Sequence, residues 1–276
     1  MEKPYKNRPQ KASKRSQTKM GAQSLFMYPS SVLTLPPPGK VLTLCTVFVF
    51  NDGETDMADM NIEQARHNMI EQQIRPWEVL DQRVLDLLST VPREDFVPEA
   101  YRNLAFADIN IPLGEDQVMM SPKVEARILQ GLNIQEDETV LEVGTGSGYV
   151  TALLANLAKQ VISVDINPDM TRQASEKLAA HGITNVTLET GDAAHGWDAH
   201  APYDVIVVTG SLPLLPATFK QALKVGGRLL AIVGDSPAMG VLLITRVGET
   251  EWAEEALFET DLPALINAPQ PERFHL

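Results

Sequence analysis

The stretch from Val140 to Tyr149 reads V-L-E-V-G-T-G-S-G-Y and combines an apolar run, one acid and three glycines at alternate positions. This order predicts a buried strand that turns tightly into a helix. Glycine suits such a turn because the backbone adopts conformations that a Cβ opposes, and because a ligand can then approach the main chain closely. The stretch therefore predicts an α/β fold and a nucleotide-type cofactor.

The spacing of the glycines separates two kinds of cofactor. A dinucleotide fingerprint, G-x-G-x-x-G, places a diphosphate at the helix N-terminus, but its last glycine position is Tyr149 here. Glu142 also precedes the loop, and a carboxylate in that place repels a diphosphate and suits a cation. The pattern therefore favours S-adenosylmethionine, which carries a sulfonium and an amino group, over a nicotinamide dinucleotide.

Two further acids are expected at the same edge of the sheet. The next apolar run ends in Asp165, 21 residues after Gly144, which is the separation at which an acid meets a ribose diol in doubly wound folds. Asn167 and Pro168 supply the cap and the first residue of the following helix, so Asp165 is free for a ligand. Asp192 follows a third strand, and we expect it to accept a hydrogen bond from an adenine amino group.

Strands and helices alternate along the body of the chain, which predicts a doubly wound, mainly parallel sheet with both faces covered. From Asn61 to Leu88 the pattern is helical with a break at Pro76, which predicts a helical cover. Residues 241–247 and 256–258 predict a C-terminal antiparallel hairpin. The predicted strands of the sheet are 139–143, 161–165, 186–190, 204–209 and 227–233, and the predicted helices are 123–132, 148–158, 168–180 and 216–223.

The charge distribution argues against several partners. Residues 57 to 276 hold 15 Lys and Arg against 32 Asp and Glu, a net charge of −17. Such a body repels nucleic acid and anionic membranes, so we expect neither as a partner. The five histidines are scattered and Cys45 is the only cysteine. We therefore expect no metal site, no internal disulfide and a cytoplasmic location.

Residues 1 to 56 have a different character. They begin with a basic segment and contain an apolar run from Val41 to Phe50, which superficially imitates a signal peptide. Prolines interrupt the region, no small-residue cleavage site follows Phe50, and ten residues are too few to span a bilayer. We expect residues 1–56 to be disordered or a non-native extension, with Met57 or Met60 as the natural start and 57–276 as the functional domain.

Taken in order, these motifs resemble the protein-L-isoaspartate O-methyltransferase family over roughly residues 62 to 276. The stretch that ends at Tyr149 is similar to the family's L-E-I-G-T-G-S-G-Y, and further landmarks are V-P-R-E-D-F-V-P from Val91, I-P-L-G from Ile111 and G-G-R-L from Gly226. The resemblance implies a class I S-adenosylmethionine-dependent methyltransferase fold. It also implies methyl transfer to the carboxylate of an isoaspartyl protein or peptide. The domain would then comprise a helical cover with the acceptor segment, 57–121, and a cofactor-binding α/β core, 122–276.

The acceptor segment departs from the family pattern. The family reads G-x-G-Q-T-I-S-x-P, and the matching residues from Gly114 to Pro122 read G-E-D-Q-V-M-M-S-P. The resemblance implies that the family Ser contacts the acceptor carboxylate, but Val118 and Met120 occupy the Thr and Ser positions here, and Asp116 replaces a glycine. Each change works against an acidic substrate, so no catalytic residue is assigned.

Ser121 is the one nearby candidate to supply the missing hydroxyl, but a Ser before a Pro at a helix start is typically a cap whose oxygen is occupied by backbone N–H groups. Met119 and Met120 are interpreted either as core residues or as lining of the acceptor pocket. Three functions remain open. They are isoaspartyl methylation with backbone N–H groups binding the acceptor, methylation of a different, less anionic acceptor, and cofactor binding without transferase activity.

The predicted cofactor-binding residues lie in the loop and at the strand ends: Glu142, Gly144, Thr145, Gly146, Gly148, Asp165, Ile166, Asp192 and Ala193. The predicted acceptor pocket consists of Gln117, Val118, Met119 and Met120. We expect a monomer.

Overall fold

The structure, a computed structural model, describes residues 61–272. The predictions for residues 1–56, and the domain boundary placed after residue 56, fall outside this range.

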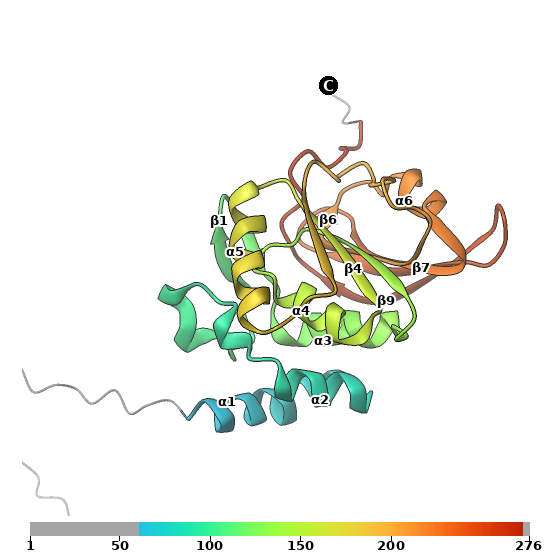
Figure 1. The fold of residues 1–276 in the computed structure, drawn as a ribbon. Helices are drawn as coiled ribbons and strands as arrows, with labels where there is room; N and C mark the ends of the chain where they lie inside the picture. The colour runs from blue at the N-terminus through green and yellow to red at the C-terminus, as the bar shows by residue number, and fades with distance from the viewer. Residues whose placement is uncertain (1–60, 273–276) are drawn as a thin grey trace, which may run out of the picture. The chain divides into compact units, whose positions relative to one another are not determined.

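A seven-stranded sheet forms the centre of the described chain (Figure 1). Five parallel strands run in the order β5-β4-β3-β6-β7, and the antiparallel strands β8 and β9 extend the sheet beyond β7. The predicted doubly wound sheet with a C-terminal hairpin is confirmed. The strands are β3 Thr139–Val143, β4 Gln160–Asp165, β5 Val186–Thr190, β6 Tyr203–Leu212, β7 Leu223–Val233, β8 Met239–Arg246 and β9 Trp252–Thr260.

Helices cover the sheet in successive layers. α3 contacts β7, α4 and α5 contact β4, and α2 packs on α3 and α4, so α1 and α2 lie outside α3 and α4 in Figure 1. The helices are α1 Ile62–Met69, α2 Gln82–Thr90, α3 Pro122–Leu132, α4 Tyr149–Leu157, α5 Pro168–Ala180 and α6 Ala217–Gln221. The predicted break at Pro76 is a 3-10 turn, Arg75–Trp77, that follows a π-helical turn, Ile70–Ile74. Two further 3-10 turns, Arg93–Asp95 and Glu99–Leu104, lead to β1.

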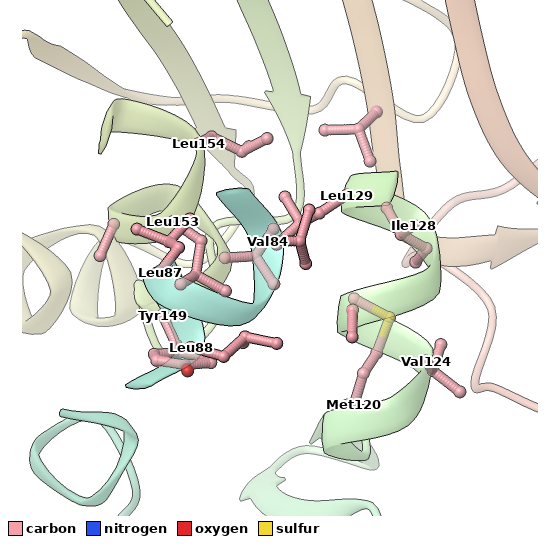
Figure 2. Packing of buried hydrophobic residues seen from close by; sticks show 14 of the residues in the cluster. Val84, Leu87, Leu88, Met120, Val124, Ile128, Leu129, Tyr149, Leu153 and Leu154 are labelled. Atoms are coloured by element: carbon pink, nitrogen blue, oxygen red, sulfur yellow. The ribbon is translucent and has the colours of Figure 1, made fainter. Parts of the chain in front are cut away.

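Side chains of the central strands alternate between two separate cores, because successive residues of a strand point to opposite faces. Val140 belongs to the core beneath α2, α3 and α4, whereas Leu141 and Val143 belong to the core on the other face. Figure 2 shows the first core, where side chains from α2 and α3 interleave with Leu153 and Leu154 of α4. Full burial of each such aliphatic side chain stabilises the fold by about 1.5–3 kcal/mol.

A small hairpin that the sequence did not predict lies between the helical cover and α3. Its strands β1, Ile111–Gly114, and β2, Gln117–Met119, are antiparallel. Glu115 and Asp116 form the turn with φ of +50° and +58°. Two successive residues with positive φ are typical of a hairpin turn of type I′, which favours Gly, Asn and Asp. The acceptor segment is therefore held as a strand pair rather than as a loose loop.

Candidate active site

A cavity of about 710 Å³, including the part open to solvent, lies at the carboxyl ends of the parallel strands. Ligands of open α/β sheets bind at this edge, because the strand order reverses there and leaves a crevice. The wall of this first cavity is built from Leu113, Gly114, Glu115, Gln117, Val118, Val143, Gly144, Gly146, Val164, Asp165, Ile166, Asn167, Met170, Gly191, Asp192, Ala193, Ala194, Thr209, Gly210, Leu265 and Ile266.

The glycines of the loop after β3 have two different tasks. Gly144 and Gly146 line the first cavity with φ of +101° and +52°, and a Cβ on Gly144 would lie 2.5 Å from Thr209 Oγ1. Gly148 does not line this cavity. A Cβ there would lie 3.0 Å from the Cβ of Ala174 on α5, so Gly148 lets α4 begin close to its neighbouring helix. Gly148 thus lies outside the wall of the first cavity, and its contact with the cofactor stays a prediction.

Asp165 lies in the wall of the first cavity at the end of β4. Its Oδ2 accepts from the Gly146 N–H at 2.8 Å and its Oδ1 from the Asn167 N–H at 2.9 Å. Asn167 caps α5 by accepting from the Asp169 N–H, as the sequence predicted. Asp165 is therefore not needed as a cap, and its carboxylate is fixed by the backbone at the mouth of the Gly-rich loop.

Asp192 and Ala193 lie after β5 in the wall of the same cavity. Asp192 Oδ1 accepts from the Ala194 N–H, and its Oδ2 accepts from Asn267 Nδ2 at 2.8 Å. Asn267 follows a segment whose backbone pairs with Ser211 at the end of β6. The C-terminal segment thus closes one side of the cavity and contributes Leu265 and Ile266 to its wall.

The charge of the first cavity has one sign. Glu115, Asp165 and Asp192 contribute carboxyl groups, and none of the described residues that form its wall is a Lys, Arg or His. An anionic diphosphate would be repelled here, whereas a ligand with a sulfonium and an ammonium group would be attracted. The cavity also approaches the backbone at Gly144 and Gly146, where an added Cβ would press against Thr209 and Leu113 of the wall. These features fit S-adenosylmethionine.

Glu142 lies elsewhere than predicted. Strand alternation puts it on the face of Val140, beneath α4, where its Oε2 accepts from Thr151 Oγ1 at 2.5 Å and Ser163 Oγ at 2.6 Å. Its side chain is fully buried and is not part of the cavity wall. Burial raises the pKa of Glu142 to about 8, although the two hydroxyl hydrogen bonds lower it in part. Glu142 thus lies outside the wall of the first cavity, and its direct contact with the cofactor stays a prediction.

A second cavity of about 290 Å³ adjoins the first. The two cavities share Leu113, Val118, Gly144, Gly146 and Thr209. The remainder of the second wall consists of Met119, Met120, Glu125, Thr145, Ser147 and Val150. Thr145, which was predicted to bind the cofactor, belongs to this second wall and shares a hydrogen bond of 2.6 Å with Ser163.

The predicted acceptor residues divide between the cavities. Gln117 lines the first, Val118 lines both, and Met119 and Met120 line the second. The two methionines also belong to the hydrophobic core and are almost fully buried. Figure 2 shows the Met120 side chain among core residues near the start of α3. The two interpretations of these methionines are thus compatible, because each methionine both packs in the core and borders the second cavity.

The surroundings of the Ser121 and Ser147 hydroxyls could not be foreseen from the sequence. Ser121 stands at the N-cap of α3, but its side chain makes no capping hydrogen bond and lies in neither cavity wall. The interpretation of its hydroxyl as a cap is wrong. Ser147, which was not singled out, lines the second cavity, and its Oγ accepts from the Tyr149 N–H at 3.3 Å.

Sequence reasoning also missed Thr209, Leu265, Ile266 and Glu125. Thr209 lies near the carboxyl end of β6, so the rule that located the strand-end acids could have found it. No sequence signal marks the other three as cavity residues. Within residues 61–272, no group of three or more His, Cys, Asp and Glu side chains is placed to hold a metal ion, and no helix is long and apolar enough to cross a membrane.

Comparison with known proteins identifies the family. Residues 64–259 match the model of the family described as protein-L-isoaspartate(D-aspartate) O-methyltransferase. The chain is 39% identical over 208 residues to a protein-L-isoaspartate O-methyltransferase of Rhodopseudomonas palustris, which covers 74% of this chain and 95% of that protein. It is 41% identical over 187 residues to one from Methanoculleus marisnigri, which covers 67% of this chain and 85% of the relative. The chain belongs to the protein-L-isoaspartate(D-aspartate) O-methyltransferase family.

Solved structures agree with this fold. A protein-L-isoaspartate O-methyltransferase superposes with a TM-score of 0.64 at 22% identity over 73% of this chain and 66% of that one. A Plasmodium falciparum protein described as a putative member of the family, in complex with S-adenosyl-L-homocysteine, gives a TM-score of 0.62 at 17% identity and covers 75% of this chain and 98% of its own. The chain is accordingly an S-adenosylmethionine-dependent methyltransferase of the protein-L-isoaspartate type.

Proposed function

We propose that this methyltransferase holds its methyl donor in the first cavity and the isoaspartyl carboxylate of a damaged protein in the second. The observation that carries this proposal is the shared wall of the two cavities, formed by the Gly-rich loop, Leu113, Val118 and Thr209. Because the two cavities adjoin along these residues, a donor in the first and an acceptor in the second can meet without crossing the hydrophobic core. S-adenosylmethionine, when bound, supplies an electrophilic methyl group.

On the donor side, the strand-end acids would hold the two ends of the nucleoside. Asp165, fixed by two backbone N–H groups, would accept from the ribose hydroxyls, with Ile166 beside it in the cavity wall. Asp192 and Ala193 would border the adenine. Glu142, being buried, would support the loop through Ser163 and Thr145 rather than touch the donor.

On the acceptor side, the chemistry makes modest demands. A carboxylic acid with an ordinary pKa of about 4 is ionised at neutral pH, so no general base is needed to activate the acceptor oxygen. Holding the carboxylate in line with the methyl group can contribute about 7–11 kcal/mol of the rate enhancement. The apolar side chains of Val118, Met119 and Met120 would exclude water from that contact.

Ser147 is our candidate for the hydroxyl that binds the acceptor carboxylate, because Val118 and Met120 stand where the family has Thr and Ser. Its Oγ accepts one backbone N–H, and no hydrogen bond donated by this hydroxyl is found within residues 61–272. It lies in the wall of the second cavity and can donate to a carboxylate there. Hydrogen bonds to charged groups are typically worth about 1.5–3 kcal/mol.

The test is a methyl-transfer assay on the full chain with an isoaspartyl peptide and its aspartyl counterpart. We expect transfer to the isoaspartyl peptide alone. Ser147→Ala is expected to raise KM about 10- to 100-fold, whereas Ser121→Ala, one residue from the family Ser position but outside both cavities, should leave KM unchanged. The opposite result for the two serines would refute the assignment. Binding of S-adenosylmethionine without transfer to any isoaspartyl peptide would favour a different acceptor or no transferase activity.

We also propose that the substrate is the main partner, with neither nucleic acid nor an anionic membrane bound, and that the enzyme works as a cytoplasmic monomer. The net charge of −17 on residues 57–276 argues against nucleic-acid and membrane partners, and the single cysteine is consistent with a cytoplasmic location. Sedimentation of the purified protein tests the oligomeric state, and a retardation assay with tRNA tests nucleic-acid binding.

A further inference from the structure

The second cavity contains a carboxyl group that methyl transfer, as described so far, does not use. Glu125, on the first turn of α3, lies in its wall, and its side chain is fully buried. Glu125 Oε2 accepts a hydrogen bond from the Arg93 guanidinium, whereas Oε1 has no partner among the described residues. A buried carboxyl oxygen without a partner is costly, so its place beside the acceptor cavity calls for a ligand.

Within residues 61–272, the charged groups around Glu125 leave no cation free for an acceptor. Arg93 is buried, and besides Glu125 it donates to the carbonyl oxygens of Ala105 and Met120, each at 2.7 Å. Its guanidinium carbon lies 5.0 Å from the ring centre of Tyr149 on α4. Burial raises the pKa of Tyr149, so this phenol stays neutral at physiological pH. The ion pair between Arg66 of α1 and Glu94, 2.5 Å between Nη2 and Oε1, also acts electrostatically on Tyr149.

The other polar side chains of the second wall are mostly occupied. Thr145 is bonded to Ser163, and Thr209 Oγ1 donates toward the carbonyl oxygens of Val143 and Gly144. An acceptor carboxylate entering this cavity would therefore face Glu125 with little to separate it from the negative charge that Glu125 carries when it is ionised. Two carboxylates in one site cannot both stay ionised without a large energetic penalty, so one of them takes up a proton.

We propose that Glu125 is a proton-linked acceptor-binding residue, which takes up one proton from solvent as the isoaspartyl carboxylate enters and then donates a hydrogen bond to it from Oε1. In this state Oε2 continues to accept from Arg93. The proton returns to solvent when the neutral methyl ester leaves. This inference rests on the proposed function, because it assigns the second cavity to the acceptor.

The electrostatic environment supports this role. Burial raises the pKa of Glu125 to about 7, although the charge and the hydrogen bond of Arg93 lower it in part. Near neutral pH the proton is therefore gained or lost at little cost, and a second negative charge in the cavity shifts the balance further toward the acid form. Protonated carboxyl groups that donate to an anionic reactant are a known device of enzyme sites.

The experiment measures KM and kcat from pH 6 to pH 9 at saturating S-adenosylmethionine, with an isoaspartyl peptide that has blocked termini and no histidine. The peptide carboxyl stays ionised throughout this range, so its own titration does not contribute. In the wild type we expect KM to rise about tenfold for each pH unit above about 7, because only the protonated enzyme binds the acceptor. We expect kcat to change much less.

Two variants separate this role from a structural one. Glu125→Gln keeps a neutral hydrogen-bond donor and an acceptor for Arg93, so its KM should stay near the low-pH wild-type value from pH 6 to pH 9. Glu94→Gln is the matched control, because it neutralises a neighbouring buried carboxylate that lies in neither cavity wall, and it should keep the wild-type dependence on pH. A Glu125→Gln enzyme with the wild-type slope would refute the proposal.

Calorimetry on the wild type decides the matter if Glu125→Gln does not fold. Peptide binding in the presence of S-adenosylhomocysteine, measured in buffers of different ionisation enthalpy, should take up about one proton at pH 8 and almost none at pH 6. No uptake at pH 8 would overturn the inference. A wild type that methylates the peptide with a KM independent of pH defeats only this inference, whereas a wild type inactive toward the peptide at every pH defeats the proposed function itself.

Discussion

The two cavities obtain their polar groups in different ways. In the first, the carboxylates of Asp165 and Asp192 stand at strand ends, and each accepts at least one backbone N–H. In the second, the polar groups are side chains that bond to backbone groups or to side chains outside the wall, and the wall is formed mainly by the β1-β2 hairpin, the Gly-rich loop and the start of α3. Sheet topology thus determines the donor side, whereas local packing determines the acceptor side. Substitutions on the two sides should therefore differ in what they change.

The largest expected loss of cofactor affinity follows substitution of Gly144, where the backbone itself forms the wall of the first cavity. Gly144→Ala puts a Cβ 2.5 Å from Thr209 Oγ1 at a φ of +101°. The loop must move, and we expect binding of S-adenosylhomocysteine to weaken at least about 100-fold. Isothermal titration calorimetry measures this constant.

Gly226→Ala is the matched control for that change. Gly226 also has a positive φ, +86°, but an added Cβ meets no heavy atom within 4 Å. It therefore carries a similar backbone cost without a clash in the cavity, and its cofactor affinity should remain within about threefold of the wild type. Equal losses in the two variants would show that strain alone, and not the shape of the cavity, is responsible.

The next effect concerns the side chain that borders the same loop. Asp165→Ala removes the carboxylate from the cavity wall and the acceptor of two N–H groups. We expect the cofactor to bind about 10- to 100-fold more weakly. Asp169→Ala, on the exposed start of α5 where the carboxylate bonds to Arg172, should bind as the wild type does. A calorimetric titration that gives Asp165→Ala an unchanged dissociation constant would remove this residue from the site.

A smaller effect on cofactor affinity is expected for substitution of Glu142, which is buried beneath α4. Glu142 does not line the first cavity, so Glu142→Gln should change cofactor affinity by less than about threefold. Its pKa of about 8 in the folded state exceeds the ordinary 4.5, so the fold prefers the protonated form. Wild-type stability therefore falls as the pH rises from about 4.5 to about 8, by up to about 1.4 kcal/mol per unit from this group.

Gln cannot ionise, so Glu142→Gln should lack this part of the pH dependence. Denaturant unfolding at pH 5, 6, 7 and 8 should show the variant gaining stability relative to the wild type as the pH rises. The control Glu176→Gln, on the exposed surface of α5, should parallel the wild type. A constant difference between Glu142→Gln and the wild type would contradict the burial argument.

The smallest effect is expected on the acceptor side at Met120. Met120→Leu conserves volume in the core and should lower the free energy of unfolding by less than about 1.5 kcal/mol. The KM for an isoaspartyl peptide should remain within about threefold of the wild type, because an apolar side chain still borders the cavity. If KM rises tenfold while stability is unchanged, the thioether contacts the acceptor directly.

Much of the donor side could be predicted from the sequence, because its rules are local. The strands that end at Val143 and Asp165, and the Asn167 cap of α5, follow from patterns within a few residues. The positions of Glu142 and Gly148 did not follow so simply. Alternation within β3 turns Glu142 beneath α4, and the approach of α5 to α4 gives Gly148 a packing task. Both depend on helices that lie elsewhere in the chain.

The acceptor side was harder to predict. The sequence revealed that hydroxyls are missing at Val118 and Met120, but Ser121 was wrongly assigned a capping hydrogen bond. The hairpin brings Val118 and Met119 to the second cavity, where the Gly-rich loop also forms part of the wall. Glu125, on the first turn of α3, lies in the same wall. A buried carboxyl paired with Arg93, 32 residues earlier, has no signature within a short stretch of sequence.

The sequence by itself determined the doubly wound sheet and, through the resemblance of its ordered motifs, the family, and it predicted where the methyl donor binds. It could do so because the period of apolar residues, the glycine spacing and the strand-end acids are set by backbone geometry over short distances. Only the tertiary structure decided which of these acids line the first cavity, and that a buried Glu125 and Ser147 line the second. Burial and the meeting of distant segments are properties of the packed chain, since they fix which polar groups keep a free hydrogen-bonding position.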